Sequence, residues 1–349
     1  MKTLTPNRIA KIRLLNQNLI TPQFGEVTEL VDWFGMLQAQ QYQMMRWAVA
    51  MRTKRPSFRA FKDAFDSGTV IRTHLFRCTW QLVTSEDLAW MLPLCAERNR
   101  QALRGFLAGR NESVSEKEYE RFNVAVADVL SGHKSMTKDE LCLHLEEKGR
   151  SAGNHVTSIC LRRAEVDGVI CSGVLDDRQN TYALVCDRVP KAGAIGRDEA
   201  LARLCRKYFR SHGPATFADF VWWTNLPATD CKEALSSIES ELTPIVCDGQ
   251  TYYMHQDCRT GGCRNRVILL PSYDEYLIGY KSRHVAIADE HQRLAYSNNG
   301  LFYPVVVADG NVVGRWYPKQ NHVKFFEEFE TVDMAEEFDR YRRFAAQSQ

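Results

Sequence analysis

The chain has 349 residues, of which 44% are hydrophobic and 25% are charged. These values are ordinary for globular domains and exclude the disordered, collagen-like and coiled-coil classes. The length predicts two or three compact units, and the net charge of +2 gives no overall sign of a nucleic-acid-binding protein.

The charge is unevenly distributed along the chain. Residues 1–110 contain 16 Lys and Arg against 8 Asp and Glu, a net charge of +8, whereas the remainder contains 29 against 35, a net charge of −6. Such a split favours a partner that carries phosphates. On charge alone, the alternative that both segments are ordinary solvated surfaces stays open.

Residues 1–110 are predicted to form a helical segment followed by paired strands. The helix at 42–52 is the candidate recognition helix, which would enter a groove of DNA. The predicted elements are helices at 8–18, 27–37, 42–52 and 58–66, strands at 69–76 and 78–83, and a helix that begins at Ser85.

Residues 111–190 carry the clearest local pattern. Thr137 and Glu140 form a capping box, a strong signal for the start of a helix. Helix, turn, helix and hairpin is the order of a winged helix-turn-helix, whose second helix can enter the major groove. The predicted elements are a spacer helix at 112–134, helices at 137–149 and 154–167, and hairpin strands at 169–175 and 181–185.

Residues 191–260 repeat this order of elements, although not the residues themselves. Thr216 and Asp219 cap a helix, and Asp248-Gly249 between two β-rich runs predicts a tight hairpin. The predicted elements are helices at 197–210, 216–223 and 228–239, and strands at 243–247 and 251–254.

Residues 261–349 change to a β-rich pattern. Strands are predicted at 266–271, 301–308, 311–317 and 324–329, and an amphipathic helix at 327–349. The predicted fold class is therefore α+β, with three tandem winged helix-turn-helix units followed by a small C-terminal β-barrel, or a curled sheet, that the terminal helix closes. The expected domains are 1–110, 111–190, 191–260 and 261–349.

Cysteine usage and hydropathy predict the compartment. The eleven cysteines are scattered singly, which favours a reducing cytoplasm over a disulfide-bonded scaffold. There is no apolar run that resembles a signal peptide, and no apolar stretch approaches the roughly 18 residues of a membrane span. Only Cys258 and Cys263 lie close together, without a second pair to complete a zinc site. We therefore expect a cytoplasmic protein with no metal, no cofactor and no membrane partner.

Four strings occur along the chain in a recognisable order. They are M-L-Q-A-Q at 36–40, R-T-H-L-F-R-C-T-W-Q-L-V at 72–83, L-L-P-S-Y-D-E-Y-L-I-G-Y-K-S-R at 269–283 and N-G-L-F-Y-P-V-V-V-A-D-G-N-V-V-G-R-W at 299–316. Together they span nearly the whole chain, and their order and content resemble the AlkZ/YcaQ family of winged-helix DNA glycosylases. The last two strings are too long for chance agreement.

The resemblance implies a DNA glycosylase, which we expect to be metal-free and, because no lysine is placed to act as a Schiff-base nucleophile, monofunctional. Members of such a family hydrolyse the N-glycosidic bond of alkylated bases in double-stranded DNA, including N7-adducted purines and interstrand cross-links. The family places its catalytic pair in a Gln-apolar-Gln or Gln-apolar-Asp motif. Here the matching residues are Gln38 and Gln40, as in the AlkZ-like branch. Because three winged helices in one chain make an extended DNA surface, we expect a monomer.

The chemistry of two amides limits what such a pair can do. Residues i and i+2 lie on one side of an extended segment but about 200° apart on a helix, so residues 37–40 should be non-helical. An amide can orient water by hydrogen bonding but is too weakly basic to remove a proton. A glutamine pair therefore suits a leaving group that is already activated, such as a cationic N7-alkylated purine. Taken without the resemblance, Gln-Ala-Gln is more often a surface turn.

Cationic and polar side chains near these motifs are the predicted DNA contacts. In the first hairpin they alternate with apolar residues and are expected to hold phosphates near the lesion. Trp47, on the candidate recognition helix, is interpreted as core in preference to a DNA contact. Asp274 and Glu275 are expected to brace the barrel against the helical domain through buried hydrogen bonds, in preference to acting as acid and base. The predicted DNA-binding residues are Arg46, Arg72, His74, Arg77, Gln81, Lys281 and Arg283.

Two glutamines leave questions open. Relatives commonly have T-W-H or T-L-H where this chain has Thr79-Trp80-Gln81, so Gln81 leaves the lesion preference undecided. Gln41, directly after the proposed pair, has no assigned role.

Two other functions remain as alternatives. One is a non-catalytic winged-helix DNA-binding or regulatory protein, which dimerisation and effector control would favour, and the other is a protein-interaction scaffold.

Overall fold

The computed structural model describes residues 2–149, 154–191, 193, 195–262, 266–328 and 334–347. The chain divides into two compact units. Unit 1 comprises residues 1–61 and 201–349, and unit 2 comprises residues 62–200. Cys263, the end of the strand predicted at 324–329 and part of the helix predicted at 327–349 lie outside the described residues.

The N-terminal part of unit 1 is helical, with one short extended interruption. Its elements are β1 (Lys2–Thr3), α1 (Pro6–Asn16), α2 (Val27–Phe34), β2 (Leu37–Gln38) and α3 (Met44–Ala50). Helix α2 ends at Gly35, whose φ of 79° suits a residue without a side chain. The chain then runs extended through β2, so the prediction that residues 37–40 are non-helical is confirmed.

Helix α3 is an interior element of unit 1. All seven of its residues are buried, and Trp47 packs against Tyr341 and Phe344 of the C-terminal helix. The prediction that Trp47 belongs to the core is therefore confirmed. The expectation that this helix presents a face to a DNA groove is wrong, because its residues, Arg46 included, are buried on every side of the helix.

The middle of unit 1 has the predicted order of helices and hairpin. The elements are α10 (Arg197–His212), α11 (Phe217–Thr224), α12 (Ala228–Ser237), β8 (Leu242–Cys247) and β9 (Gln250–His255). Thr216 and Asp219 form the predicted capping box of α11. Strands β8 and β9 are antiparallel around Asp248-Gly249, and β1 adds to β8 in parallel. That these elements constitute a winged helix stays a prediction.

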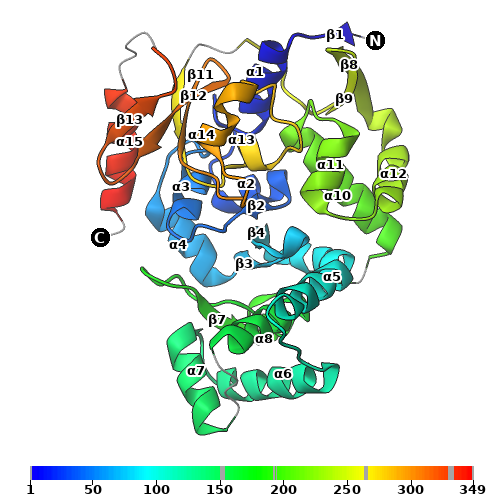
Figure 1. Ribbon diagram of the computed structural model, residues 1–349, viewed down its shortest axis with the longest axis vertical. Helices are drawn as coiled ribbons and strands as arrows, with labels where there is room; N and C mark the ends of the chain where they lie inside the picture. Colours follow the sequence, from blue (N-terminus) through cyan, green and yellow to red (C-terminus); the bar gives the residue numbers. More distant parts are fainter. Residues whose placement is uncertain are drawn as a thin grey trace. The chain divides into compact units, whose positions relative to one another are not determined.

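The C-terminal part of unit 1 contains an open sheet. Its strands lie in the order β10-β11-β12-β13 and are antiparallel, and α15 packs on the sheet through Phe338 and Tyr341 (Figure 1). Within the part of the chain that the structure describes, no strand pairing closes this sheet, so the predicted barrel is not found. Four short strands covered by a helix bury their apolar face without closure. The elements are β10 (Val267–Leu270), α13 (Glu275–Ile278), α14 (Gln292–Ala295), β11 (Val305–Ala308), β12 (Asn311–Tyr317), β13 (His322–Phe325) and α15 (Ala335–Ala346).

Unit 2 contains a hairpin, a long helix and a smaller helical cluster. Strands β3 and β4 pair antiparallel, and α5 packs along α8 (Figure 1). Thr137 and Glu140 form the predicted capping box of α7. Helix α4 (Phe58–Ser67) leads into the unit. Its other elements are β3 (Val70–His74), β4 (Trp80–Thr84), α5 (Ser85–Ala108), α6 (Glu116–Leu130), β5 (Met136–Thr137), α7 (Lys138–Glu147), α8 (Asn154–Val166), β6 (Ile170–Ser172), β7 (Thr181–Leu184) and α9 (Val185–Arg188).

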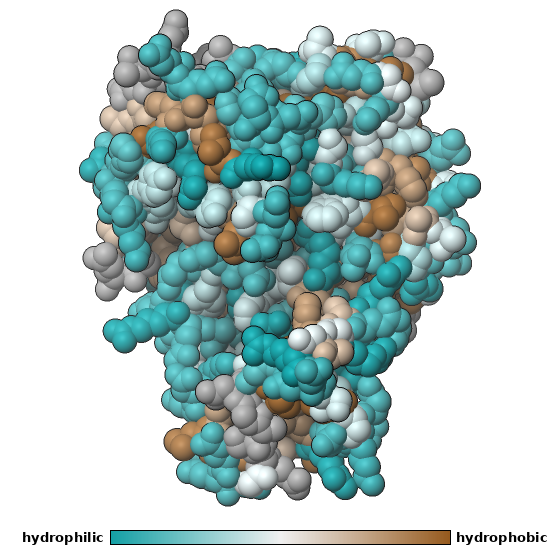
Figure 2. Space-filling view, in the orientation of Figure 1, coloured by the Kyte–Doolittle hydropathy of each residue, from teal (hydrophilic) through white to brown (hydrophobic). Residues whose placement is uncertain are grey.

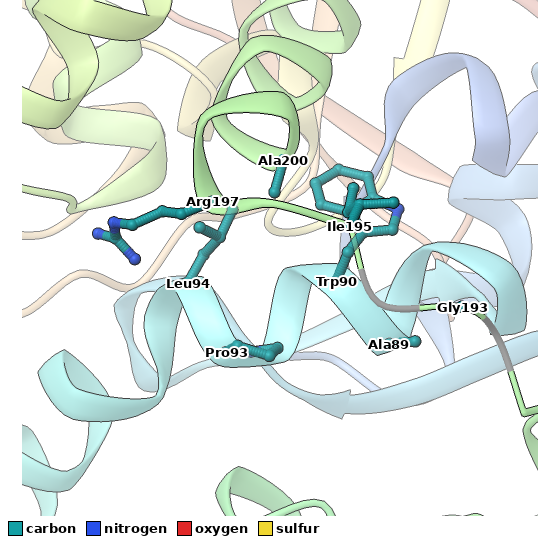
Figure 3. A pocket seen from close by; sticks show the side chains of 8 residues that line it. All are labelled: Ala89, Trp90, Pro93, Leu94, Gly193, Ile195, Arg197 and Ala200. Carbon is teal, nitrogen blue, oxygen red and sulfur yellow. The ribbon is translucent and has the colours of Figure 1, made fainter.

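A pocket of about 330 Å³ lies in unit 2 between α5 and residues 193–200, which include the first turn of α10 (Figure 3). Its lining is mainly apolar: Trp90 on α5 lies beside Ile195, and Leu94 points from the same helix toward the segment that carries Arg197 and Ala200. It holds none of the predicted catalytic or DNA-binding residues. We assign it no function.

The surface shows no broad apolar area on the face seen in Figure 2, where hydrophobic side chains form small patches among hydrophilic ones. None of the helices in the described ranges is long and apolar enough to cross a membrane.

An ion pair in unit 1 predicts a pH-dependent contribution to stability. Arg206 donates two hydrogen bonds of 2.7 Å to Glu241, and Nε2 of His255 lies 2.9 Å from the same carboxylate. Chiefly through Arg206, these partners lower the pKa of the Glu241 carboxyl from 4.5 to about 2. Because the folded pKa lies below the ordinary value, the stabilisation is present above pH 4.5 and is lost as the pH falls from 4.5 towards 2.

The variant Arg206→Met should therefore be less stable than the wild type by about 1 kcal/mol near pH 6, since the pair is partly exposed. This difference should shrink as the pH is lowered to about 3. Urea unfolding at both pH values measures it, and a difference that does not change with pH contradicts the assignment.

Candidate active site

The Gln38–Gln40 segment is held in place by its backbone. The Gln38 N–H donates to Oε1 of Glu275 at 2.7 Å, across 237 positions of sequence. Gln38 is buried, and its own Oε1 accepts the N–H of Ala39 at 3.0 Å. The segment thus has a defined position although β2 is only two residues long.

Gln40 differs from Gln38 in what its side chain contacts. Its Oε1 is buried, and the described residues provide it with no hydrogen-bond donor. A buried acceptor without a donor is costly and is normally satisfied by water or a ligand. The Gln40 amide oxygen is therefore an unused acceptor of this motif that is enclosed in this structure. An enclosed water molecule, or a rearrangement that opens the oxygen to a substrate, would satisfy it.

Gln41 has a structural contact. Its side chain is exposed, and Oε1 accepts the N–H of Met44 at 2.7 Å, the first residue of α3. It therefore satisfies one of the backbone donors that a helix start leaves unpaired. The sequence left this role open because glutamine is not a usual capping residue.

Glu275 connects the motif to the middle of unit 1. Its carboxylate is 2% exposed, and its Oε2 lies 3.2 Å from Nε2 of His212 and 3.3 Å from Nε1 of Trp223. Because a carboxylate oxygen only accepts, both nitrogens carry the hydrogens of these bonds. Burial lowers the pKa of His212 below its ordinary value of 6.5, which favours the neutral ring. One buried carboxylate thus joins β2, α10, α11 and α13.

Asp274 makes a second buried connection. Its two oxygens accept hydrogen bonds of 2.9 and 2.7 Å from Arg52, which follows α3, and Arg52 also donates to the carbonyl of Ala48 at 2.8 Å. Arg52 and Asp274 are both almost fully buried. The buried hydrogen bonds predicted for Asp274 and Glu275 are confirmed, whereas the barrel that they were expected to brace is not found among the described residues. Sequence reasoning missed Arg52, His212 and Trp223, which lie far from Asp274 and Glu275 in the chain.

Three of the predicted DNA-binding residues lie in unit 1. Arg46 is 3% exposed, and its guanidinium lies 5.0 Å from the ring centre of Tyr42 and 5.5 Å from that of Phe58. Arg283 is partly buried and donates to the carbonyl of Leu277 at 2.8 Å. Lys281 is exposed, and its backbone N–H donates to the buried Asp219. Of the three, Lys281 presents its charge most openly to solvent.

The other four lie in the β3–β4 hairpin of unit 2. Arg72 donates to Asn180 at 2.8 Å and lies 4.2 Å from the ring centre of Trp80. His74 bonds to Glu165 through Nδ1, and Gln81 donates to the carbonyl of Phe76 at 3.2 Å. The side chains of Arg72, His74 and Gln81 are all buried.

Arg77 lies at the tip of the hairpin with a left-handed backbone, φ 62°. Asn99 stabilises this turn by bonding the Cys78 N–H and the Leu75 carbonyl. Contact of DNA with Arg77, or with the buried Arg72, His74 and Gln81, stays a prediction. For the described residues, no group of three or more His, Cys, Asp or Glu is arranged to hold a metal ion.

Comparison with known proteins gives one consistent result. The family model described as DNA glycosylase AlkZ-like matches residues 31–344. An interstrand DNA cross-link repair glycosylase from Streptomyces sahachiroi is 26% identical over 305 residues, which cover 80% of this chain and 79% of that protein. The structure of the Streptomyces sahachiroi DNA glycosylase AlkZ matches with a TM-score of 0.80 at 21% identity, covering 100% of this chain and 98% of that one.

Proposed function

Because the chain belongs to the AlkZ-like family of DNA glycosylases, we propose that it hydrolyses the N-glycosidic bond of alkylated purines in duplex DNA. The substrates are N7-adducted purines, and the description of the Streptomyces sahachiroi relative favours interstrand cross-links among them. The observation that carries the proposal is how the structure holds Gln38 and Gln40. Its segment is fixed by a buried carboxylate, and the Gln40 oxygen is buried without a donor among the described residues.

The reaction needs little from the protein, because an N7-alkylated purine is cationic and leaves readily. As the glycosidic bond breaks, positive charge develops on the sugar. The amide oxygen of Gln40 accepts a hydrogen bond from a water molecule and holds it close to the anomeric carbon. Its dipole also stabilises the developing charge. Gln38, in β2, is the second amide of the pair and helps to orient the same water molecule. The water's proton passes to solvent, and an abasic site and a free base remain.

Product formation tests this function. A duplex with a single N7-methylguanine, and a second with a nitrogen-mustard cross-link, is incubated with the protein, and abasic sites are revealed by alkaline cleavage. We expect alkali-dependent cleavage of both, and EDTA should not change it because the proposed chemistry uses no metal. Failure of both duplexes to show cleavage above the buffer control contradicts the proposal. Inhibition by EDTA contradicts the metal-free chemistry.

DNA affinity is proposed to depend on exposed cations such as Lys281. Arg72, His74, Arg77, Gln81 and Arg283 are the further predicted contacts, whereas Arg46 lies on the buried helix α3 and would contact DNA only if that helix became exposed. Replacing Lys281 by alanine should weaken binding to all sequences alike and reduce the salt slope by about 1, because one phosphate contact is lost. Fluorescence anisotropy at several salt concentrations measures the slope. An unchanged slope excludes Lys281 as a phosphate contact. The protein is proposed to act as a monomer.

A further inference from the structure

We infer that Glu275 is a positioning residue for the glutamine pair, acting through the backbone of Gln38; this inference rests on the proposed function. Its Oε1 accepts the Gln38 N–H at 2.7 Å, the shortest of the distances that join it to Gln38, His212 and Trp223. Glu275 touches the motif through the main chain and has no direct part in the chemistry.

The burial of this carboxylate indicates more than a stabilising role. Removing a charged group from water is expensive, and buried charges are often no better for stability than apolar side chains of similar size. Glu275 is 2% exposed, and the N–H groups of Gln38, His212 and Trp223 compensate its charge. A carboxylate does what an apolar side chain cannot, since it fixes the position of one particular backbone N–H.

The position of that N–H determines where both glutamines lie. Strand β2 has only two residues, and α13 packs against it. From Gln38 the chain continues through the buried Ala39 directly to Gln40. If the Gln38 backbone shifts, the Gln40 oxygen shifts with it, and a displacement of about 1 Å in an active site can reduce a rate by roughly 100-fold.

Asp274 provides a contrast. Its carboxylate forms a two-point ion pair with Arg52 after α3, so its charge is neutralised within the core. Asp274 thus accounts for the bracing of α3, whereas Glu275 bonds the Gln38 backbone directly.

The test separates position from stability. In Glu275→Gln, one amide oxygen replaces the two carboxylate oxygens that accept from Gln38, His212 and Trp223. In Glu275→Ala both of these acceptors are lost. We expect the single-turnover rate of N7-methylguanine release to fall by roughly 10-fold in the first variant and roughly 100-fold in the second. DNA affinity should stay within about 2-fold of wild type, because Glu275 is buried and offers no surface group to a phosphate.

A matched control removes a different buried hydrogen bond from the same core. Tyr208→Phe deletes the 3.1 Å bond from the Tyr208 hydroxyl to the Gly279 carbonyl. It keeps the ring that packs on His212 and Trp223, the two side chains bonded to Glu275. It should lower Tm without changing the rate. Hydrogen exchange of a peptide that contains residues 36–40 should accelerate in Glu275→Ala and not in Tyr208→Phe. If Glu275→Ala does not fold, Glu275→Gln decides.

The inference is overturned if Glu275→Gln releases base at the wild-type rate, or if Tyr208→Phe loses as much rate as the Glu275 variants. A loss of DNA affinity equal to the loss of rate also overturns it. Gln40→Ala, assayed in parallel, separates this failure from failure of the proposed function. If Gln40→Ala keeps the wild-type rate, the glutamine mechanism itself is wrong.

Discussion

Replacing Gln40 by alanine should lower the single-turnover rate of N7-methylguanine release by about 100-fold, because the variant loses the amide oxygen that orients water and stabilises charge. In the structure this oxygen is buried, and the described part of the chain gives it no donor, so alanine removes no internal hydrogen bond of the oxygen. Stability should change little. Quenched-flow or manual sampling, with enzyme in excess over a duplex that carries one lesion, measures the rate.

The neighbouring glutamine supplies the control for this variant. Gln41→Ala removes the acceptor for the Met44 N–H and should cost about 1 kcal/mol of stability, as other helix-cap losses do. Its rate of base release should equal that of the wild type. Equal rates for Gln40→Ala and Gln41→Ala, whether both high or both low, would show that the amide of Gln40 has no special part in the reaction.

Replacing Arg52 by alanine should destabilise unit 1 by about 3–5 kcal/mol, the largest stability effect that we expect for a single substitution. The loss of stability arises from Asp274, which remains in the core of the variant. Asp274 is 4% exposed, and without Arg52 its carboxylate would be buried with no opposite charge beside it. Arg52 also donates to the Ala48 carbonyl in the last turn of α3, so the end of that helix loses a contact as well.

Thermal unfolding followed by circular dichroism measures this effect, with a decrease in Tm of roughly 5–15 °C expected for a chain of this size. The double variant Arg52→Met/Asp274→Leu is the informative control, since it removes the charge together with its partner. It should be clearly more stable than Arg52→Ala. If the double variant is no more stable than the single one, an uncompensated buried charge is not the cause.

Local signals in the sequence predicted most of the elements correctly. The capping boxes at Thr137 and Thr216 and the Asp248-Gly249 turn lie where they were expected, because caps and tight turns depend on residues close together in the chain. The resemblance to the AlkZ/YcaQ family is confirmed by the family match over residues 31–344. The non-helical state of residues 37–40 followed from the chemistry that two glutamines would have to perform.

Features that depend on contacts distant in sequence were not predictable in this way. The burial of α3 results from packing against the C-terminal helix, about 290 residues later, so its composition could equally indicate a recognition helix. The open sheet follows from how strands pair, which strand patterns alone do not determine. Likewise, the sequence does not show that the Arg72 guanidinium donates to Asn180 and lies against the ring of Trp80.

The most direct test of the glutamine mechanism is chromatography of the free base released in one turnover from a duplex with a single N7-methylguanine. The wild type should release about one base per duplex and leave a strand that breaks only after alkali. The double variant Gln38→Ala/Gln40→Ala should release base no faster than buffer does. Equal release by both proteins, or strand scission before alkali with a borohydride-trapped protein adduct, would contradict hydrolysis by a water that the glutamine pair orients.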